Sequence, residues 1–208
     1  MSPAPAAEVP RPRSHWRRYG VLYAVIAVSL APVIASYLAY YVFQPSGRTN
    51  YGTLLEPRPV LTQPLLRETG PSLSLSELGG RWVLVTAGGG ACTEPCRAAL
   101  LQMRQQRLMT GKEMERIERV WLVTDAAPIA PELLRAYDGM HVLRAPADAV
   151  NALLVAPDGS GVEGHVFLVD PMGNLMLRWP LDPEPQRVKK DLARLLTASS
   201  HWVRVQKK

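Results

Sequence analysis

A long apolar run without a single charged residue spans positions 21–43, near the N-terminus. At the rise of an α-helix this run crosses a hydrocarbon core of roughly 30 Å, and tyrosines near both ends suit the two membrane interfaces. A cleaved signal peptide has a shorter apolar region of about 7 to 15 residues, followed by small residues at the cleavage site. Here the run leaves through the letters YYVFQPSGR, which make a poor cleavage site. The pattern predicts an uncleaved transmembrane anchor at 21–43, after a tail at 1–20.

Shorter apolar and amphipathic segments alternate along the rest of the chain. Residues 44–59 are rich in turn formers and predict a tether. Beyond the tether, near-continuous apolar runs predict buried strands, and apolar positions on one face predict helices. The expected elements are strands at 81–87 and 119–125, helices at 94–110 and 184–199, and a hairpin at 165–179. Because strands alternate with helices, residues 60–208 are predicted to form one α/β sandwich with a mixed central sheet.

The distribution of charge predicts the orientation of the anchor. The nearest basic residue after the apolar run is Arg48, whereas four arginines precede it: Arg11, Arg13, Arg17 and Arg18. Positively charged flanks stay in the cytoplasm, so the domain is expected outside, in a bacterial periplasm, with a single-pass anchor in the inner membrane. The rest of the chain is only weakly basic, which gives no case for nucleic-acid binding. In an oxidising periplasm, two cysteines can form a disulfide.

The two cysteines of the chain, Cys92 and Cys96, lie in the stretch TAGGGACTEPC. This stretch joins a predicted strand to a predicted helix, at the edge where open α/β sheets bind ligands. The helix N-terminus carries partial positive charge, which lowers the pKa of a thiol. A phosphate-binding loop would require a Gly-Lys-Ser/Thr ending, which is missing here. Cys92, as the loop cysteine, is expected to be the more exposed and therefore the attacking thiol.

The spacing of the pair leaves three interpretations open: a structural staple, a redox couple or part of a metal site. Four-residue helical spacing places Cβ atoms about 5–6 Å apart. A disulfide prefers about 3.5–4.5 Å, so a modest adjustment of the first turn allows either a bond or two separated thiolates. Soft thiolates favour Cu(I) or Zn(II). A disulfide that closes so short a loop adds little stability through chain entropy, which disfavours the staple.

Several segments resemble the Sco/SenC-type proteins, which are membrane-anchored, thioredoxin-fold factors for the copper site of cytochrome c oxidase. They are the letters NYG at 50–52, GGRWVLVTAGGGACTEPC at 79–96, WLVTD at 121–125 and FLVDPMGNLMLRW at 167–179. The resemblance implies a thioredoxin-like three-layer sandwich, copper as the bound metal and the copper-containing subunit of cytochrome c oxidase as the partner. It also implies an aspartate after the second strand, here Asp125, for which a turn-capping role suffices.

The resemblance further implies a histidine as a third copper ligand, about five residues before the aromatic of the hairpin strand. Counting back from Phe167 reaches Val162, and the only histidine nearby is His165. Side chains alternate along a strand, so this offset can turn the imidazole away from the sulfurs, although the letters GVEGH allow a shift of register. His165 is therefore the candidate third ligand beside Cys92 and Cys96. The alternative is a strand-edge histidine without a metal.

Three function classes follow for the cysteine pair. The first is a copper chaperone for the oxidase, with Cys92, Cys96 and His165 as ligands. The second is a thiol-disulfide oxidoreductase that reduces the copper-ligand cysteines of the oxidase. The third is an assembly partner without redox activity. An ordinary thioredoxin-like enzyme would show C-x-x-C and a proline before the hairpin strand, where this chain has Gly164.

Overall fold

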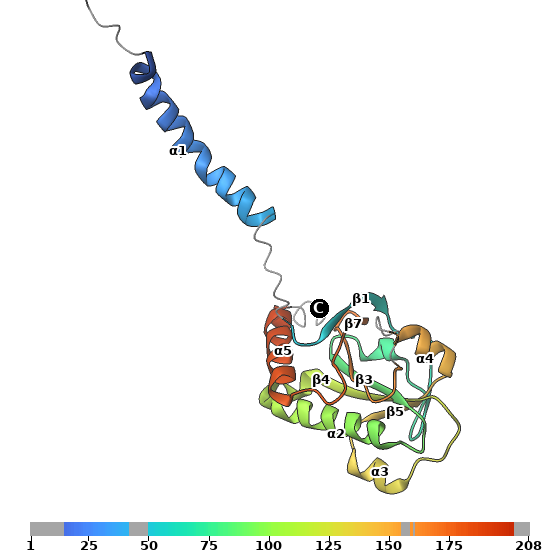
Figure 1. Cartoon of the computed structure of the whole chain (residues 1–208). Coiled ribbons are helices and arrows are strands. Elements are labelled where there is room, and N and C mark those ends of the chain that lie inside the picture. The colour runs from blue at the N-terminus through green and yellow to red at the C-terminus, as the bar shows by residue number, and fades with distance from the viewer. Residues whose placement is uncertain (1–14, 42–49, 155–158, 160, 202–208) are drawn as a thin grey trace, which may run out of the picture. The chain divides into compact units, whose positions relative to one another are not determined.

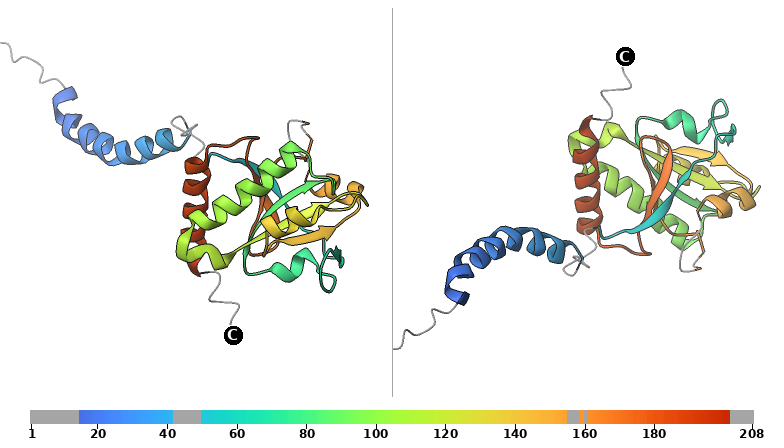
Figure 2. Two further views of the ribbon diagram at one scale, coloured as in Figure 1. Left: turned by 90° about the horizontal axis from the view of Figure 1, so that it is seen from below. Right: turned by 90° about the horizontal axis from the view of Figure 1, so that it is seen from above.

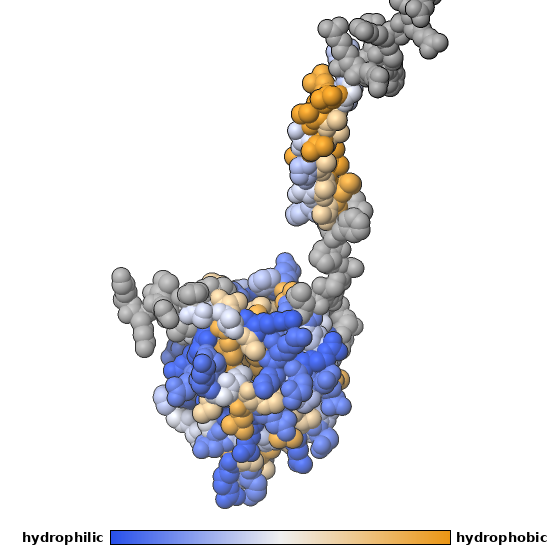
Figure 3. Space-filling model, turned by 90° about the vertical axis from the view of Figure 1, so that its left-hand side faces the viewer, coloured by the Kyte–Doolittle hydropathy of each residue, from blue (hydrophilic) through white to orange (hydrophobic). Residues whose placement is uncertain are grey.

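The computed structural model describes residues 15–41, 50–154, 159 and 161–201 (Figure 1). The chain divides after residue 48 into two compact units. The first contains helix α1 (His15–Tyr41). Among the described residues, α1 is the one helix that is long and apolar enough to cross a membrane, through its stretch Tyr19–Tyr41. Figure 3 shows hydrophobic side chains along this helix. The N-terminal apolar helix is confirmed, and its use as an anchor stays a prediction. Residues 1–14 of the predicted tail and 42–49 lie outside the described residues.

The second unit is built on a mixed sheet of seven strands in the order β1-β7-β6-β3-β4-β5-β2. Strands β3, β4 and β5 run parallel, and the other pairs are antiparallel. The strands are β1 (Thr53–Pro59), β2 (Leu66–Arg67), β3 (Trp82–Gly88), β4 (Ile117–Val123), β5 (His141–Arg144), β6 (Phe167–Val169) and β7 (Asn174–Arg178). The predicted strands and the predicted hairpin are therefore present.

Helices cover both faces of this sheet (Figures 1 and 2). The α-helices are α2 (Glu94–Met109), α3 (Pro131–Ala136), α4 (Ala147–Leu153) and α5 (Pro185–Ala198), and the 3₁₀ helices are η1 (Leu75–Leu78), η2 (Gly111–Arg116) and η3 (Ser199–His201). Alternate residues of β3 enter two separate cores: Trp82 and Leu84 pack with α2 and α5, whereas Val83 and Val85 pack with η1 and α4. The predicted α/β sandwich with three layers is confirmed.

The predicted tether, 44–59, is too long, because residues 53–59 form strand β1. This strand pairs antiparallel with β7, and its register shifts between Leu54 and Arg58. β1 lies at the edge of the sheet, and an edge strand tolerates prolines such as Pro57 because one of its sides needs no ladder hydrogen bonds. The prolines of this segment, which in the sequence suggest a linker, therefore belong to an edge strand.

A buried carboxylate on α5 fixes the segment just before β1. Asp191, only 2% exposed, accepts hydrogen bonds from the backbone N–H groups of Tyr51 and Gly52 at 2.9–3.1 Å. The indole N–H of Trp179 donates to the same carboxylate at 3.3 Å. A Cβ at Gly52 would stand 2.4 Å from Leu177 Cδ2, so glycine lets the backbone approach β7 closely. Residues 51 and 52 therefore belong to the folded domain.

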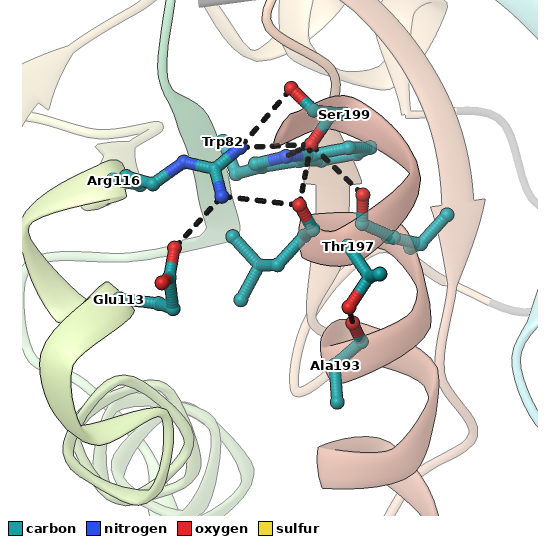
Figure 4. A network of polar contacts seen from close by, with 8 residues as sticks. Trp82, Glu113, Arg116, Ala193, Thr197 and Ser199 are labelled. Atoms are coloured by element: carbon teal, nitrogen blue, oxygen red, sulfur yellow. Dashed lines mark hydrogen bonds and ion pairs between the residues drawn. The ribbon is translucent and has the colours of Figure 1, made fainter. Parts of the chain in front are cut away.

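A polar network fixes the other end of α5 (Figure 4). The Arg116 guanidinium donates to Glu113 Oε2 at 2.8 Å, to the Leu196 carbonyl at 3.0 Å and to Ser199 Oγ at 3.0 Å. The Trp82 indole N–H also donates to Ser199 Oγ, at 2.9 Å. These bonds satisfy carbonyls that the end of a helix leaves without intrahelical partners. They connect α5 to η2 and to the start of β3.

Candidate functional site

Cys92 and Cys96 form a disulfide at the C-terminal end of β3, with a Cα–Cα distance of 5.2 Å. The predicted location is confirmed: α2 begins at Glu94, and Cys96 lies in its first turn. Cys92 precedes the helix and has a φ of 44°, a left-handed conformation that is uncommon for residues other than glycine. The four-residue helical spacing therefore does not describe the pair, because the chain turns before the helix begins.

Both cysteines are buried, with exposed fractions of 2% for Cys92 and 0% for Cys96. Cys92 is the more exposed of the two, as expected, but only by this small margin in the disulfide form, and its role as the attacking thiol stays a prediction. The pair belongs to the core shared by α2 and α5, which also contains Ile129 and Val166. Disulfide exchange needs a thiolate to reach a sulfur atom. Exchange with another protein thus requires local opening around this loop.

Close contact between two loops explains the glycines before the cysteines. A Cβ at Gly89 would stand 2.5 Å from Asp125 Oδ2, and one at Gly90 would stand 2.3 Å from the Ala127 carbonyl oxygen. Asp125 Oδ1 accepts the backbone N–H groups of Gly90 at 2.8 Å and of Ala127 at 3.1 Å. Arg144 donates to the carbonyls of Asp125 and Ala127. The turn-capping role of Asp125 is confirmed, and the same carboxylate also positions the glycine loop.

The segment before β6 brings a carboxylate to the site. Glu163 forms an isolated parallel bridge with Ala87, and its Oε1 accepts the hydroxyl of Thr93, the N-cap residue of α2, at 2.6 Å. Gly164, at a φ of 80°, lies so close to α2 that a Cβ there would stand 2.8 Å from Pro95 Cβ. Glu163 is not among the site residues that the sequence predicts. It lies two residues before His165 in the segment GVEGH, whose glycines are the signal for an irregular chain path at this place.

His165 is buried within the same segment and is 4% exposed. Its Nδ1 lies 3.1 Å from the Trp179 carbonyl oxygen, and its own carbonyl accepts the Thr86 hydroxyl at 2.9 Å. In the part of the chain that the structure describes, no group of three or more His, Cys, Asp or Glu side chains could hold a metal ion. The structure joins Cys92 to Cys96, and the role of His165 as a ligand stays a prediction.

A second polar cluster lies at the start of β4, away from the cysteines. Glu118 forms ion pairs with Arg81 and with His141, whose Nε2 lies 3.3 Å from Glu118 Oε2. Hydrogen bonding to His141 lowers the pKa of Glu118, and Arg81 adds to this effect, while burial opposes it. Arg67 contacts the other ring nitrogen of His141. This histidine therefore joins β2, β4 and β5.

A family model described as "Transmembrane-like, thioredoxin-like, C-terminal domain" matches residues 82–199. The chain belongs to this family. The match begins with β3 and ends just after α5, so it includes the cysteine pair, the glycine loop and the whole hairpin. No curated protein matches the chain in sequence.

Solved structures share the fold at low sequence identity. Copper-bound ScoI from Bradyrhizobium japonicum is 19% identical, with a TM-score of 0.51, and the match covers 68% of this chain and 100% of that one. Apo Sco1 from Thermus thermophilus is 23% identical, with a TM-score of 0.54, covering 73% and 99%. A putative protein disulfide isomerase from Bacteroides thetaiotaomicron is 16% identical, with a TM-score of 0.53, covering 74% and 98%. These similarities establish the thioredoxin-like fold.

Proposed function

We propose that this chain is a thiol-disulfide protein anchored in a bacterial inner membrane, which reduces the copper-ligand cysteines of a cytochrome c oxidase subunit in the periplasm. The observation that carries the proposal is the Cys92–Cys96 disulfide at the first turn of α2. A helix N-terminus stabilises a thiolate, and the thiolate is the form that attacks a disulfide. The resemblance of the cysteine and hairpin motifs to Sco/SenC-type proteins supports the oxidase subunit as the client.

The reaction transfers two electrons from the reduced pair to the client. A thiolate of the pair attacks the client disulfide, the client S–S bond breaks, and a mixed disulfide forms as one client thiolate leaves. The second cysteine then loses its proton and attacks the mixed disulfide. The Cys92–Cys96 bond forms, the second client thiolate leaves, and the two client sulfurs take up the two protons. The product is the disulfide form that the structure contains.

The periplasmic location is part of the proposal. The apolar stretch Tyr19–Tyr41 and the arginines before it support an anchor with its N-terminus in the cytoplasm. Alkaline phosphatase fused to the C-terminus should be active, because this enzyme requires the oxidising periplasm, and a cytoplasmic reporter fused at the same point should be silent. The reverse pattern would contradict both the orientation and the proposed chemistry.

Peptide reduction tests the chemistry directly. The full chain in a nonionic detergent is reduced, freed of reductant and mixed with a disulfide-bonded peptide that carries the copper-ligand cysteines of an oxidase subunit. We expect stoichiometric reduction of the peptide by the wild type, little by Cys92→Ser or Cys96→Ser, and a disulfide in the spent protein by mass spectrometry. Peptide reduction no faster than by the double serine variant would overturn the proposal.

Copper delivery is the second candidate, and the convergence of the two sulfurs supports it. Two thiolates suit Cu(I), and the copper-bound ScoI structure shares this fold. The reduced chain should then compete with a Cu(I) chelator for one ion, and either serine variant should lose this ability. If His165 is a ligand, His165→Ala should weaken Cu(II) binding much more than Cu(I) binding, because Cu(II) prefers nitrogen donors. A wild type that binds no copper but reduces the peptide would exclude this candidate.

A further inference from the structure

Every charged side chain that α5 exposes is positive. The carboxylate within the helix, Asp191, is buried and bonded to the chain before β1. Two exposed carboxylates, Asp182 and Glu184, precede the helix, where they suit the positive end of its dipole. Lys190 and Arg194 lie four positions apart, a spacing at which like charges on a helix repel each other. The exposed cations form the basic face of α5, which consists of Arg187, Lys189, Lys190 and Arg194. An anionic surface against this face would relieve the repulsion.

The charge of the helices differs between the two sides of the sheet. On the side of η1 and α4, these helices contain no Lys or Arg, and their charged residues are Glu77 and Asp148. On the side of α5, the short helices α3 and η2 carry equal numbers of acidic and basic residues. Helix α2 adds Glu94 and three arginines, which are Arg97, Arg104 and Arg107. The helices of one layer are therefore positive as a group, and those of the other are negative.

A cavity of about 390 Å³ adjoins the basic face, between η2 and α5. Its lining includes the apolar side chains of Met109 and Leu196 and the ammonium groups of Lys112 and Lys189. Arg116 also lines the cavity, but its guanidinium already donates to protein acceptors (Figure 4). The two lysines form no ion pair within the described residues. The cavity thus combines apolar walls with two cations, which suits the glycerol and phosphate end of a phospholipid.

The N-terminal chain enters the domain at α5. Asp191 holds the backbone N–H groups of Tyr51 and Gly52. Nine residues separate Tyr51 from Tyr41, where α1 ends. An extended chain spans at most about 3.5 Å per residue, so the entry point of the domain lies no farther than roughly 35 Å from the end of α1. The surface of a bilayer that holds α1 is therefore within reach of α5.

We propose that the basic face of α5 and the adjoining cavity bind the phosphate groups of anionic phospholipids in the bilayer that holds the anchor. This inference rests on the membrane anchor of the proposed function. Lysine and arginine side chains are attracted to an anionic bilayer, and the attraction falls off within about 8 Å at physiological salt. Docking turns the layer of α2 and α5 toward the bilayer and the layer of η1 and α4 toward solvent.

Fluorescence quenching by a nitroxide headgroup lipid measures this docking. The full chain is inserted into nanodiscs that contain the nitroxide lipid in either phosphatidylcholine or an equal mixture of phosphatidylcholine and phosphatidylglycerol. Cys92 and Cys96 are joined and buried, so a maleimide dye without reductant labels only a new cysteine. Gln186→Cys places the dye on the exposed side of α5, and Asn151→Cys places it on α4 as a matched control. We expect stronger quenching at residue 186 than at residue 151 when phosphatidylglycerol is present, and weak quenching at both without it.

Substitution of the two lysines of α5 tests the role of charge. Lys189→Gln combined with Lys190→Gln should lower the ratio of docked to undocked domain about 25-fold, at about fivefold for each cation near an anionic surface. Lys189→Arg combined with Lys190→Arg keeps both charges and should keep the quenching. Arg135→Gln removes a positive charge from α3 and should change little. These side chains are exposed, so all variants should unfold at the urea concentration of the wild type.

Three results would overturn lipid binding by this surface. They are quenching at residue 186 that does not depend on phosphatidylglycerol, quenching that survives the double glutamine substitution, and stronger quenching at residue 151 than at residue 186. The first would leave an acidic protein as the occupant of the basic face, and the last would place another face of the domain on the bilayer.

The outcomes also separate this inference from the proposed function, because peptide reduction is measured in detergent without a bilayer. A chain that docks as expected but does not reduce the oxidase peptide loses the proposed chemistry and keeps lipid binding. A chain that reduces the peptide but shows no lipid-dependent quenching keeps the chemistry and loses lipid binding. A chain that does not insert into nanodiscs contradicts the anchor and this inference together.

Discussion

Asp191→Asn should loosen the segment that precedes β1. The native carboxylate accepts two backbone N–H groups, from Tyr51 and Gly52, and the indole N–H of Trp179. Asparagine is nearly isosteric, but it replaces one acceptor oxygen by an NH₂ group that faces N–H donors. The substitution therefore removes hydrogen bonds and leaves buried donors without acceptors, while packing volume stays the same.

The expected loss is large because Asp191 is 2% exposed. A hydrogen bond to a charged group contributes about 1.5–3 kcal/mol, and a buried donor without an acceptor costs about 1–3 kcal/mol. Asparagine keeps one acceptor, so we expect the free energy of unfolding to fall by about 3 kcal/mol. For a domain of this size, the melting temperature should fall by about 6–12 °C, at roughly 2–4 °C per kcal/mol.

Urea unfolding of the full chain in detergent, followed by tryptophan fluorescence, measures this loss by linear extrapolation. The matched control is Asp148→Asn, because Asp148 is exposed in the first turn of α4. The control should stay within about 0.5 kcal/mol of the wild type. A loss below about 1 kcal/mol for Asp191→Asn would refute the reasoning, since it would mean that the N-terminal segment is not bonded to α5.

Three further substitutions test other parts of the domain. The lowered pKa of Glu118 means that its stabilising effect is present above the ordinary value of 4.5 and is lost as the pH falls through the lower folded value. Glu118→Gln should therefore reduce the loss of stability in acid, measured by urea unfolding from pH 6 to 3. Gln106 is buried, and its amide atoms have no hydrogen-bond partner within the described residues, so Gln106→Met should raise the unfolding free energy by about 1 kcal/mol. Gly90→Ala should lower it by about 1–3 kcal/mol through the clash with the Ala127 carbonyl, and should slow reoxidation of the cysteine pair in a thiol assay.

The central strands and α2 could be predicted because their signals are local. β3 is buried at every position, which produces the unbroken apolar run, and Pro95 near the helix start marks the beginning of α2. The predicted helix at 94–110 agrees with Glu94–Met109 to within one residue. β1 could not be predicted in this way, because its evidence is the partner strand β7, which lies far along the chain. In the sequence alone, the prolines of this segment suggest a linker. Only the pairing of β1 with β7 identifies the segment as an edge strand.

The site illustrates the same limit at the scale of single residues. Glu163 and His165 are two positions apart, and in a regular strand their side chains would lie on the same face. β6 begins only at Phe167, and Gly164 between them has a φ of 80°, so the alternation on which the sequence argument relied does not extend to this segment. The turn at Gly164 brings the carboxylate to Gly88 and the imidazole to the Trp179 carbonyl. Counting from the aromatic reaches this segment but cannot decide which of its side chains lies beside the cysteine loop.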